Sequence, residues 1–489
     1  MGETLTSAAP TRNRKWPPVA IAATLLGAIQ LLIGALWAGV PSYWGDETAT
    51  LTATNRSLAD LGKLVSHIDG VHATYYVIQG AYMSIAGTDP FAARLTSVLA
   101  VALTVAGTVV LGKRLVSLRA GILAGVVGVF LPGLAWTSTE LRSFALTALF
   151  AVVTALLMES ATRRPSKARW AGYAAALTLS IWVFVFSALL LIPLAVMAWS
   201  RKSLRPWLWT TGAALIASLP VVALTMTQTG QVAWIKLSPA QLAGKVAISQ
   251  YFFGQRPPGA SDGPLTIVAA ALTAAVVALL LWFAYRSRQR VTGDLLMLAA
   301  WVATPTFLLA AVTLLGKPLY QERYLTFTIP ALLILIGAAL AALPKRAGIA
   351  AATVICLLAL PVLASQKVES GKADNYAALA RFVEQNKGDS AGAVYAAVKA
   401  RGIDLGYPEA FEGVKDVAAG TTGAENGTFW GDTTPAADLR ADRLTGRVFL
   451  FSLTESGSAD AYYQRLIESG CRASSKQADF AITAYALDC

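Results

Sequence analysis

The sequence predicts an all-α polytopic membrane protein with a soluble α/β domain at its C-terminal end. Of its 489 residues, 55% are hydrophobic and only 14% are charged, whereas a soluble chain carries about 25% charged residues. Uncharged stretches such as 17–39 and 264–285 reach the roughly 20 apolar residues that cross a bilayer as one helix. Residues 366–489 are polar by comparison. We therefore expect a tail over 1–16, a transmembrane domain over 17–365 and a soluble domain over 366–489.

Apolar segments predict about eleven transmembrane helices. They are 17–39, 91–112, 120–137, 143–160, 170–184, 186–200, 206–227, 264–285, 292–315, 325–343 and 347–364. Five basic clusters lie between them: Lys113/Arg114/Arg119, Arg163/Arg164/Lys167/Arg169, Arg201/Lys202/Arg205, Arg286/Arg288/Arg290 and Lys345/Arg346. If the basic tail (Arg12, Arg14 and Lys15) is inside, eleven spans place every cluster inside, as the positive-inside rule requires.

This topology gives the protein an orientation. The first apolar run acts as a retained signal anchor, because it is too long for a signal peptide and no cleavage site follows it. Eleven spans then leave the C-terminal domain outside. We expect a multi-pass protein of the plasma membrane, the inner membrane of a bacterium, with an extracytoplasmic C-terminal domain.

Two segments need a separate argument. As a single helix, the stretch 170–200 would be about 46 Å long at 1.5 Å per residue, too long for the bilayer core, so it predicts a hairpin of two short helices. The stretch 74–86 is short and carries three tyrosines and a glutamine, which is typical of an interfacial helix. The outer face then receives the loop 41–90, a turn around Glu140 and Arg142, and the loops 228–263 and 316–324.

The C-terminal domain has the pattern of a small α/β fold. Helix-like stretches at 375–386 and 459–469 alternate with strand-like stretches at 392–398, 447–453 and 480–485. Two of the three cysteines of the chain, Cys471 and Cys489, lie in this domain. An outside location permits a disulfide between them; two free thiols are the alternative.

The basic excess does not indicate nucleic acid binding. Lys and Arg exceed Asp and Glu by 40 − 28 = 12, but they lie in short clusters between apolar runs, which is typical of loops on the inner face. The sequence also lacks a P-loop and a Rossmann fingerprint, which argues against direct use of a nucleotide or a nucleotide sugar.

Candidate chemistry lies on the outer face. Asp46 and Glu47 directly follow the first span, and His67, Asp69 and His72 lie in the same loop; His67 and His72 are the two histidines of the chain. Acidic residues beside a hydrophobic helix end are costly unless they are solvated or functional. A carboxylate there can take a proton from an attacking hydroxyl.

Cations lie at the same face. Glu140 and Arg142 flank one span, and Lys317, Tyr320 and Arg323 precede another. Arginine binds phosphate in a forked, bidentate way, although snorkelling anchors are the simpler interpretation of these cations. Carboxylates and cations at one membrane face suit chemistry on a lipid-linked phosphate.

These motifs together resemble the C-type glycosyltransferases, in the branch shared by protein O-mannosyltransferases and lipid A aminoarabinose transferases. The match consists of the Asp46-Glu47 pair, His72-Ala-Thr-Tyr-Tyr, Arg94-Leu95 through Lys113-Arg114, Glu140-Leu-Arg142-Ser-Phe-Ala-Leu146, Gln231-Val-Ala-Trp234-Ile, and Glu322-Arg323-Tyr324-Leu325 with Pro330. It spans residues 17 to about 365. One departure is Ala73-Thr74, where relatives commonly have prolines, and it leaves the acceptor open.

The resemblance implies a transferase that moves a sugar, mannose favoured and arabinose second, from a polyprenyl phosphate to a lipid, polysaccharide or protein acceptor on the outer face, with inversion. Asp46 is then the base, with Glu47 and Glu140 as further catalytic residues. The donor would contact His72, Tyr75, Arg142, Trp234, Lys317, Tyr320 and Arg323. Some relatives use a divalent metal and others do not; here His67, Asp69 and His72 would be its ligands.

Two other functions stay open from the sequence. A transporter or lipid flippase also places charges at membrane depth, but it predicts internal repeats and charges near mid-membrane. A non-catalytic envelope-assembly protein would not require the cluster around Asp46.

Overall fold

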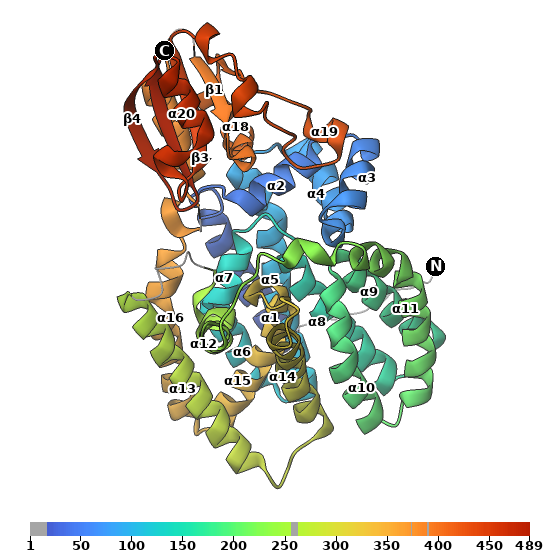
Figure 1. The fold of residues 1–489 in the computed structure, drawn as a ribbon. Coiled ribbons are helices and arrows are strands. Elements are labelled where there is room, and N and C mark those ends of the chain that lie inside the picture. The colour runs from blue at the N-terminus through green and yellow to red at the C-terminus, as the bar shows by residue number, and fades with distance from the viewer. Residues whose placement is uncertain (1–16, 256–262, 373, 389–390) are drawn as a thin grey trace, which may run out of the picture.

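The computed structural model describes residues 17–255, 263–372, 374–388 and 391–489. The predicted tail over 1–16, with its three basic residues, lies outside the described residues. The chain folds into a helical bundle that carries a small sheet domain at one end (Figure 1).

The bundle contains eight helices in the described part of the chain that are long and apolar enough to cross a membrane, or nine if a bent pair counts as one span. They are α1 (Pro18–Leu36), α5 (Pro90–Leu115), α8 (Phe144–Arg163), α11 (Leu204–Met226), α13 (Pro264–Ser287), α14 (Gly293–Leu314), η6 with α15 (Glu322–Ala342), and α16 (Lys345–Ser365). The predicted all-α membrane fold is confirmed, whereas the predicted number of spans stays a prediction.

One predicted span, 120–137, is broken. Helix α6 (Leu118–Phe130) ends two residues before Pro132, and α7 (Pro132–Ser138) continues at an angle of 61°. Proline lacks an amide hydrogen and its ring clashes with the preceding turn, so a helix bends or stops there. The break matters because α7 ends directly before the Glu140 turn.

The stretch 170–200 folds as two helical segments, as predicted. Helix α9 (Lys167–Val183) is followed by a break and then by η2 (Val185–Leu190) and α10 (Leu191–Ser200). Both segments are shorter than the eight long helices, and α9 packs between α8 and α11.

Small residues allow close packing where the central helices cross. A side-chain carbon placed on Gly121 would lie 2.4 Å from the carbonyl oxygen of Val109, and one on Gly337 would lie 2.2 Å from that of Ala120. Helices in lipid associate by van der Waals contact, so glycine at a crossing brings two backbones together. Helices α5, α6 and α15 therefore form the tightly packed centre of the bundle.

The five basic clusters gather at one end of the bundle, here called the basic end. Arg163 donates to the carbonyl of Arg114, Arg201 pairs with Asp294 at 2.6 Å, and Arg119 donates to the carbonyls of Ala341 and Leu343. The turn between α13 and α14 lies at this end, opposite the sheet domain (Figure 1). The other end is here called the domain end.

The loop 41–90 folds into short helices at the domain end. They are α2 (Gly45–Thr54), α3 (Leu58–His67), η1 (Gly70–His72) and α4 (Ala73–Ala86). The predicted helix over 74–86 is present as α4, with Tyr75, Tyr76 and Gln79 buried. The predicted loop 228–263 contains η3 (Thr229–Val232), α12 (Pro239–Gly244) and a π-helix, η4 (Lys245–Phe253).

The C-terminal domain is a five-stranded mixed sheet with the strand order β2-β1-β3-β5-β4. Strand β1 (Ala391–Tyr395) runs parallel to β2 (Val414–Asp416) and β3 (Arg447–Leu453), whereas β5 (Ile482–Asp488) is antiparallel to β3 and β4 (Arg472–Ala478). The three predicted strands are present within a few residues. Sequence patterning missed β2, which is short, and β4, which is mostly exposed.

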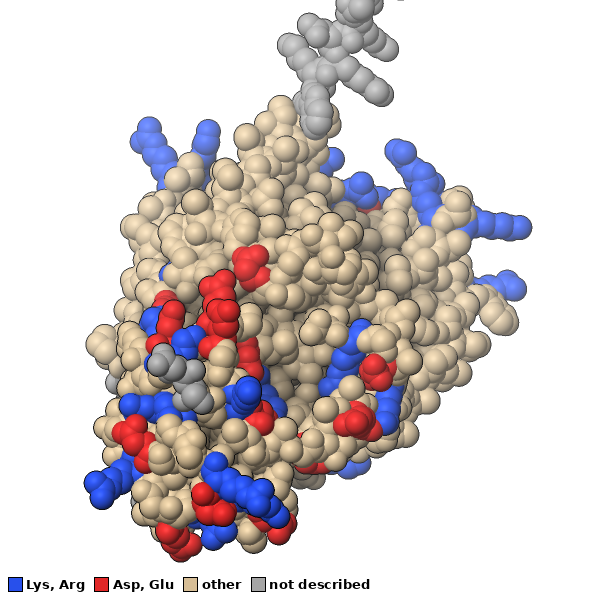
Figure 2. All heavy atoms as spheres, turned by 90° about the horizontal axis from the view of Figure 1, so that it is seen from above, with Lys and Arg blue, Asp and Glu red and all other residues tan. Residues whose placement is uncertain are grey.

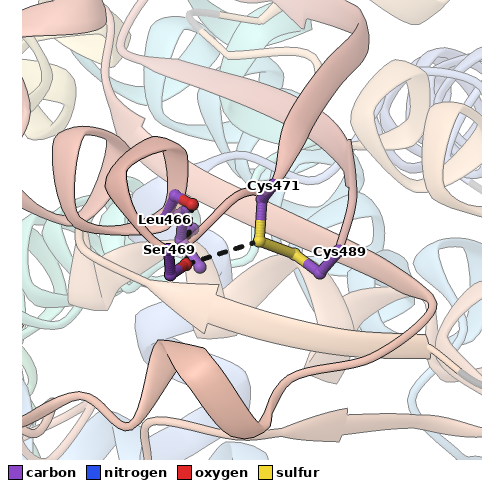
Figure 3. Close-up of a disulfide and its surroundings, with 4 residues drawn as sticks. All are labelled: Leu466, Ser469, Cys471 and Cys489. Atoms are coloured by element: carbon purple, nitrogen blue, oxygen red, sulfur yellow. Dashed lines mark hydrogen bonds between the residues drawn. A yellow bond between two sulfur atoms is a disulfide. The ribbon is translucent and has the colours of Figure 1, made fainter.

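Alternating side chains of the sheet pack into two hydrophobic cores, one on each face of the sheet. Helices α17 (Tyr376–Asn386) and α18 (Arg401–Gly406) cover the face of Phe449 and Phe451, and α20 (Ala461–Glu468) covers that of Val448 and Leu450. The predicted disulfide between Cys471 and Cys489 is formed, and it ties the start of β4 to the chain end (Figure 3).

The C-terminal domain is docked on the segment that joins the first span to α2. The Tyr407 hydroxyl accepts a hydrogen bond from the Tyr43 amide at 2.9 Å, and the Ser42 hydroxyl accepts one from the Ala377 amide at 2.8 Å. The Asp374 carboxylate accepts from the amide of Gly45 at 3.2 Å. These contacts place residues of the C-terminal domain one position away from Asp46.

Candidate functional site

Asp46 lies in the first turn of α2, at the domain end of the bundle. An acidic residue at this position is favoured by the positive end of the helix dipole. The preceding segment is fixed by Arg94 of α5, whose guanidinium donates to the carbonyls of Ala38, Pro41 and Ser42 at 2.7–3.1 Å. The chain between α1 and α2 is therefore held at a fixed distance from α5, and Asp46 with it.

Glu47, the neighbour of Asp46, is fully buried and fully paired. Its two carboxylate oxygens accept from the Arg94 guanidinium at 2.8 and 2.6 Å, and one of them also accepts from the Leu141 amide at 2.7 Å. The sequence predicted a catalytic role for Glu47. That role stays a prediction; in the structure the Glu47 side chain has no exposed surface, and its contacts hold Arg94 and the backbone of Leu141 in place.

The surroundings of Asp46 differ from those of Glu47, because two arginines from distant segments lie near its carboxylate. Arg323 of η6 (Glu322–Thr328) forms an ion pair with Oδ2 of Asp46, and Nε of Arg142 lies 4.0 Å from the same oxygen. The Asp46 side chain keeps 28% of its surface exposed, while the two arginines keep 7% and 8%. Burial alone would raise the pKa of Asp46, but Arg323 and Arg142 outweigh it and hold that pKa below its usual range.

Arg142 also links Asp46 to the loop after α3. Its Nη1 lies 3.3 Å from Oδ2 of Asp69 and donates to the Tyr76 hydroxyl at 2.9 Å, and this hydroxyl donates to Asp69 in turn. Asp69 has a left-handed backbone with a φ of 58°, which aspartate tolerates better than most residues. The network therefore joins α2, α4, the Asp69 turn and the Glu140 turn.

Glu140 is 1% exposed, and neither of its carboxylate oxygens has a hydrogen-bond partner among the described residues. Its backbone is held in place, because its carbonyl accepts from the Ser97 hydroxyl at 2.7 Å. Burial raises the pKa of Glu140, and the nearby cations Lys372 and Arg323 oppose that rise. A buried carboxylate without a partner marks a place where a ligand or water meets the protein.

His72 is buried among aromatic side chains. Its Nδ1 is 2.9 Å from the Ser143 hydroxyl, and its ring stacks on Phe184 with a centroid distance of 5.5 Å. Burial lowers the pKa of His72 to about 3, so the imidazole is neutral at physiological pH. Phe144, Phe186 and Tyr324 continue this aromatic cluster toward Arg323.

The predicted metal site is not assembled. His67 is exposed on α3, where its Nδ1 bonds to the carbonyl of Lys63, while Asp69 pairs with Arg142 and His72 points to Ser143. Across the described ranges, no group of three or more histidine, cysteine or acidic residues is arranged to hold a metal ion. Along the loop, His67 is exposed, Asp69 is half-buried and His72 is buried, which their spacing in sequence did not reveal.

Three further predicted residues fall outside the cluster around Asp46. Trp234 is 59% exposed and Lys317 is exposed, and neither forms a hydrogen bond or an ion pair with Arg323 or Asp46 in the described part of the chain. Tyr320 is fully buried, and its hydroxyl donates to Gln250 of the π-helix at 2.8 Å. These residues surround the site at most, whereas Tyr75 lies inside it and interacts electrostatically with Arg142 and Glu140.

Sequence reasoning missed two lysines that follow the last long helix. Lys367 donates to the carbonyl of Ala135 at 3.0 Å, and Lys372 lies 3.4 Å from that of Trp136 and 4.2 Å from the centre of its ring. Both carbonyls belong to the last turn of α7, where cations are favoured by the helix dipole. Their proximity to the last span was a signal, but only the fold shows what they face.

The helical bundle with a sheet domain at one end is a fold that this chain shares with several solved structures. The structure of ArnT from Cupriavidus metallidurans in the apo state superposes with a TM-score of 0.57 at 14% identity, covering 94% of this chain and 97% of that one. ArnT bound to undecaprenyl phosphate gives 0.58 at 13% identity, with the same coverage. The apo oligosaccharyltransferase of Archaeoglobus fulgidus gives 0.51 at 11% identity, covering 94% and 72%.

The likeness is one of fold and not of sequence. No protein-family model matches the chain, and no curated protein sequence matches it. The resemblance inferred from short motifs is therefore confirmed at the level of the fold.

Proposed function

We propose that the protein is an integral membrane glycosyltransferase that moves a sugar from a polyprenyl-phosphate carrier to an acceptor hydroxyl on the outer face of the membrane. The observation that carries this proposal is the shared carboxylate of Asp46, held between Arg323 and Arg142 at the domain end of the bundle. Two buried guanidiniums beside a partly exposed carboxylate suit a phosphate leaving group and a proton acceptor.

Solved structures of the same fold support the choice of donor. A crystal structure of ArnT contains bound undecaprenyl phosphate. A structure of the Archaeoglobus fulgidus oligosaccharyltransferase AglB, which superposes on this chain with a TM-score of 0.51, contains a dolichol-phosphate. Both ligands are polyprenyl phosphates. A ligand of this class would place its phosphate at the membrane surface, where Arg323 and Arg142 lie in this chain.

Asp46 pairs with the guanidinium of Arg323, to which the donor phosphate would bind in this proposal. A phosphate brings more negative charge and more acceptor oxygens than the carboxylate, so it competes for the forked guanidinium. When Arg323 turns to the phosphate, Asp46 loses its strongest partner and its pKa rises toward the usual range. The donor would thus release the base that the reaction needs.

The reaction is a single displacement. The acceptor oxygen attacks the anomeric carbon as its proton passes to Asp46, and the bond between that carbon and the phosphate oxygen breaks. The products are the glycosylated acceptor and polyprenyl phosphate, whose charge Arg323 and Arg142 stabilise. Attack from the side opposite the leaving group inverts the anomeric centre. No step is routed through a metal, because the predicted ligands do not converge.

The proposed sugar and acceptor are those that the motif resemblance implies. Mannose is the favoured sugar and arabinose the second, and the acceptor is a lipid, a polysaccharide or a protein. A transporter is less well supported, because the described charges lie at the two ends of the bundle, whereas transport predicts charges near mid-membrane.

The orientation proposed from the basic clusters is testable on its own. Seen from the domain end, the acidic side chains in view lie mostly in the lower half together with many basic ones, whereas the side chains that project along the upper rim are basic (Figure 2). The positive-inside rule then places the basic end in the cytoplasm and the sheet domain outside. Single cysteines near residues 290 and 420 should label from opposite sides of the membrane; labelling from one side would contradict this topology.

The function is tested by incubating the purified protein with radiolabelled polyprenyl-phosphate sugars and a membrane extract. We expect the wild type to transfer label to an acceptor and the Asp46→Asn variant not to do so. The control variant Asp294→Asn, which alters an ion pair at the basic end, should transfer label like the wild type. Transfer by the Asp46→Asn variant at the wild-type rate would remove Asp46 from the mechanism. No transfer from any lipid-linked sugar by the wild type would refute the proposed function.

A further inference from the structure

Several buried polar atoms near Asp46 have no hydrogen-bond partner within the described ranges of the chain. They are both carboxylate oxygens of Glu140, the hydroxyl of Tyr75 and the indole nitrogen of Trp44. Buried polar atoms are nearly always paired in folded proteins, so a group of unpaired ones indicates a ligand or bound water. This group offers two acceptors on one carboxylate and two donors on aromatic side chains.

These atoms come from three segments that converge on the Asp46 and Arg323 pair. Trp44 precedes Asp46 by two residues, and the guanidinium carbon of Arg323 lies 5.4 Å from the centre of its ring. Tyr75 comes from α4 and interacts electrostatically with Glu140, which in turn interacts with Arg323 and Asp46. A sugar attached to a phosphate on Arg323 would therefore lie among them.

Glu140 also faces a cation that the proposed reaction does not use. Lys372 is 4% exposed, lies over the ring of Trp136, and has Glu47 and Glu140 as its nearby carboxylates. Glu47 is already committed to Arg94. Burial lowers the pKa of Lys372 to about 8, which leaves most of it protonated at pH 7. Glu140 and Lys372 thus balance each other's charge without being in contact.

We propose that Glu140, Tyr75 and Trp44 form the sugar subsite of the donor, and that Lys372 makes this subsite select a neutral, hydroxyl-rich sugar over an amino sugar. The proposal rests on the proposed glycosyl transfer and names the substrate class of the same site. Hydroxyls of the sugar donate to the two free oxygens of Glu140 and accept from Tyr75 and Trp44.

Charge decides the selectivity. The carboxylates of Glu47, Asp46 and Asp69 are already paired with arginine, and that of Asp374 accepts from the Gly45 amide. The ammonium group of an amino sugar at Glu140 would therefore have to share this carboxylate with Lys372. Two like charges a few ångströms apart in a partly dehydrated site repel each other strongly. Neutral hydroxyls satisfy Glu140 without that repulsion, and they leave Lys372 its counter-charge.

Lys367 provides a matched control for Lys372. Both lysines come from the segment after α16 and both contact the last turn of α7, at the carbonyls of Ala135 and Trp136. The charges that act on Lys367 are those of two other cations, Lys372 and Arg94, whereas Glu140 is one of the carboxylates that act on Lys372. If the lysines served only to hold the end of α7, the two substitutions would have the same effect on sugar choice.

The test compares kcat/KM of the full-length protein for polyprenyl-phosphate mannose and for its 2-, 4- and 6-amino-deoxy analogues. We expect the wild type to disfavour at least one amino analogue by about 100-fold. Lys372→Met should reduce this preference by tenfold or more, whereas Lys372→Arg and Lys367→Met should retain it. Thermal unfolding in detergent checks that each variant is folded.

A second variant keeps the test decisive if Lys372→Met does not fold. Glu140→Gln removes the negative charge and leaves Lys372, so it should lower turnover of the neutral donor and strengthen discrimination against the amino analogues. Equal use of neutral and amino donors by the wild type, or a preference that Glu140→Gln leaves unchanged, would overturn the sugar subsite alone. A wild type that uses none of these donors would overturn the proposed function as well.

Discussion

The two ends of the helical bundle use arginine and carboxylate in opposite ways. At the basic end, Glu159 pairs with Arg114 and Arg163, whose side chains keep 41% and 53% of their surface exposed. At the domain end, Arg142 and Arg323 keep 8% and 7%, they share the carboxylate of Asp46, and Glu140 has no partner within the described ranges.

The difference separates charges that anchor a membrane protein from charges that bind a ligand. Exposed arginines reach water, so their ion pairs add little and need no further partner. Buried arginines and carboxylates are costly unless every charge is balanced. The domain end is left incomplete, as expected if a charged substrate completes it.

The largest expected effect follows from removing the carboxylate that both domain-end arginines share. Asp46→Asn should lower the rate of glycosyl transfer by about 10²–10⁴-fold, because the amide cannot accept the proton of the acceptor hydroxyl. Single-turnover rates with saturating donor are the measurement. A rate within a few fold of the wild type would show that the base lies elsewhere, with Glu140 as the nearest candidate.

The adjacent residue should act on stability instead. Glu47→Gln leaves the guanidinium of Arg94 buried without its counter-charge, which destabilises a protein by about 3–5 kcal/mol. We expect a clear drop in the thermal unfolding midpoint in detergent, with loss of activity following loss of fold. A stable Glu47→Gln protein that has lost transfer alone would support the catalytic role predicted from the sequence.

Arg323 should report on donor binding. A charged hydrogen bond is worth about 1.5–3 kcal/mol, so Arg323→Ala should raise the donor KM by about 10- to 150-fold. Arg323→Lys should restore part of this loss, because lysine keeps the charge but not the forked geometry. Unchanged donor kinetics in the alanine variant would remove Arg323 from the phosphate site.

The smallest effect is expected at the basic end. Arg201→Gln breaks the ion pair with Asp294 at 2.6 Å, in which both side chains are partly exposed, and should change stability by less than about 1 kcal/mol. Transfer activity should stay at the wild-type level. A large loss of activity would mean that the two ends of the bundle are coupled, and that the contrast drawn between them is too simple.

Sequence patterns predicted the membrane fold well, because long apolar runs and basic clusters are local signals. They also brought Asp46, Glu140, Arg142 and Arg323 to one face, since topology alone places helix ends together. Pairings inside that face were not predictable, because the Glu47–Arg94 pair and the Lys372–Glu140 proximity depend on how α5 and α7 pack. The predicted role of Lys317 rested on its position near a helix end and that of Trp234 on a motif resemblance, and neither fixes the direction of a side chain.

The docking of the C-terminal domain has a consequence for building hybrid proteins. The sequence changes character near residue 366, and a designer would join two proteins there. Three residues beyond that junction contact the segments beside Glu140 and Asp46: Lys367 and Lys372 contact the last turn of α7, and Asp374 accepts from the Gly45 amide. The Tyr407 hydroxyl also accepts from the Tyr43 amide. A transplanted C-terminal domain would therefore carry residues that contact the segments beside Asp46 and Glu140. We expect a hybrid protein to be active only when the 41–47 segment is exchanged together with this domain.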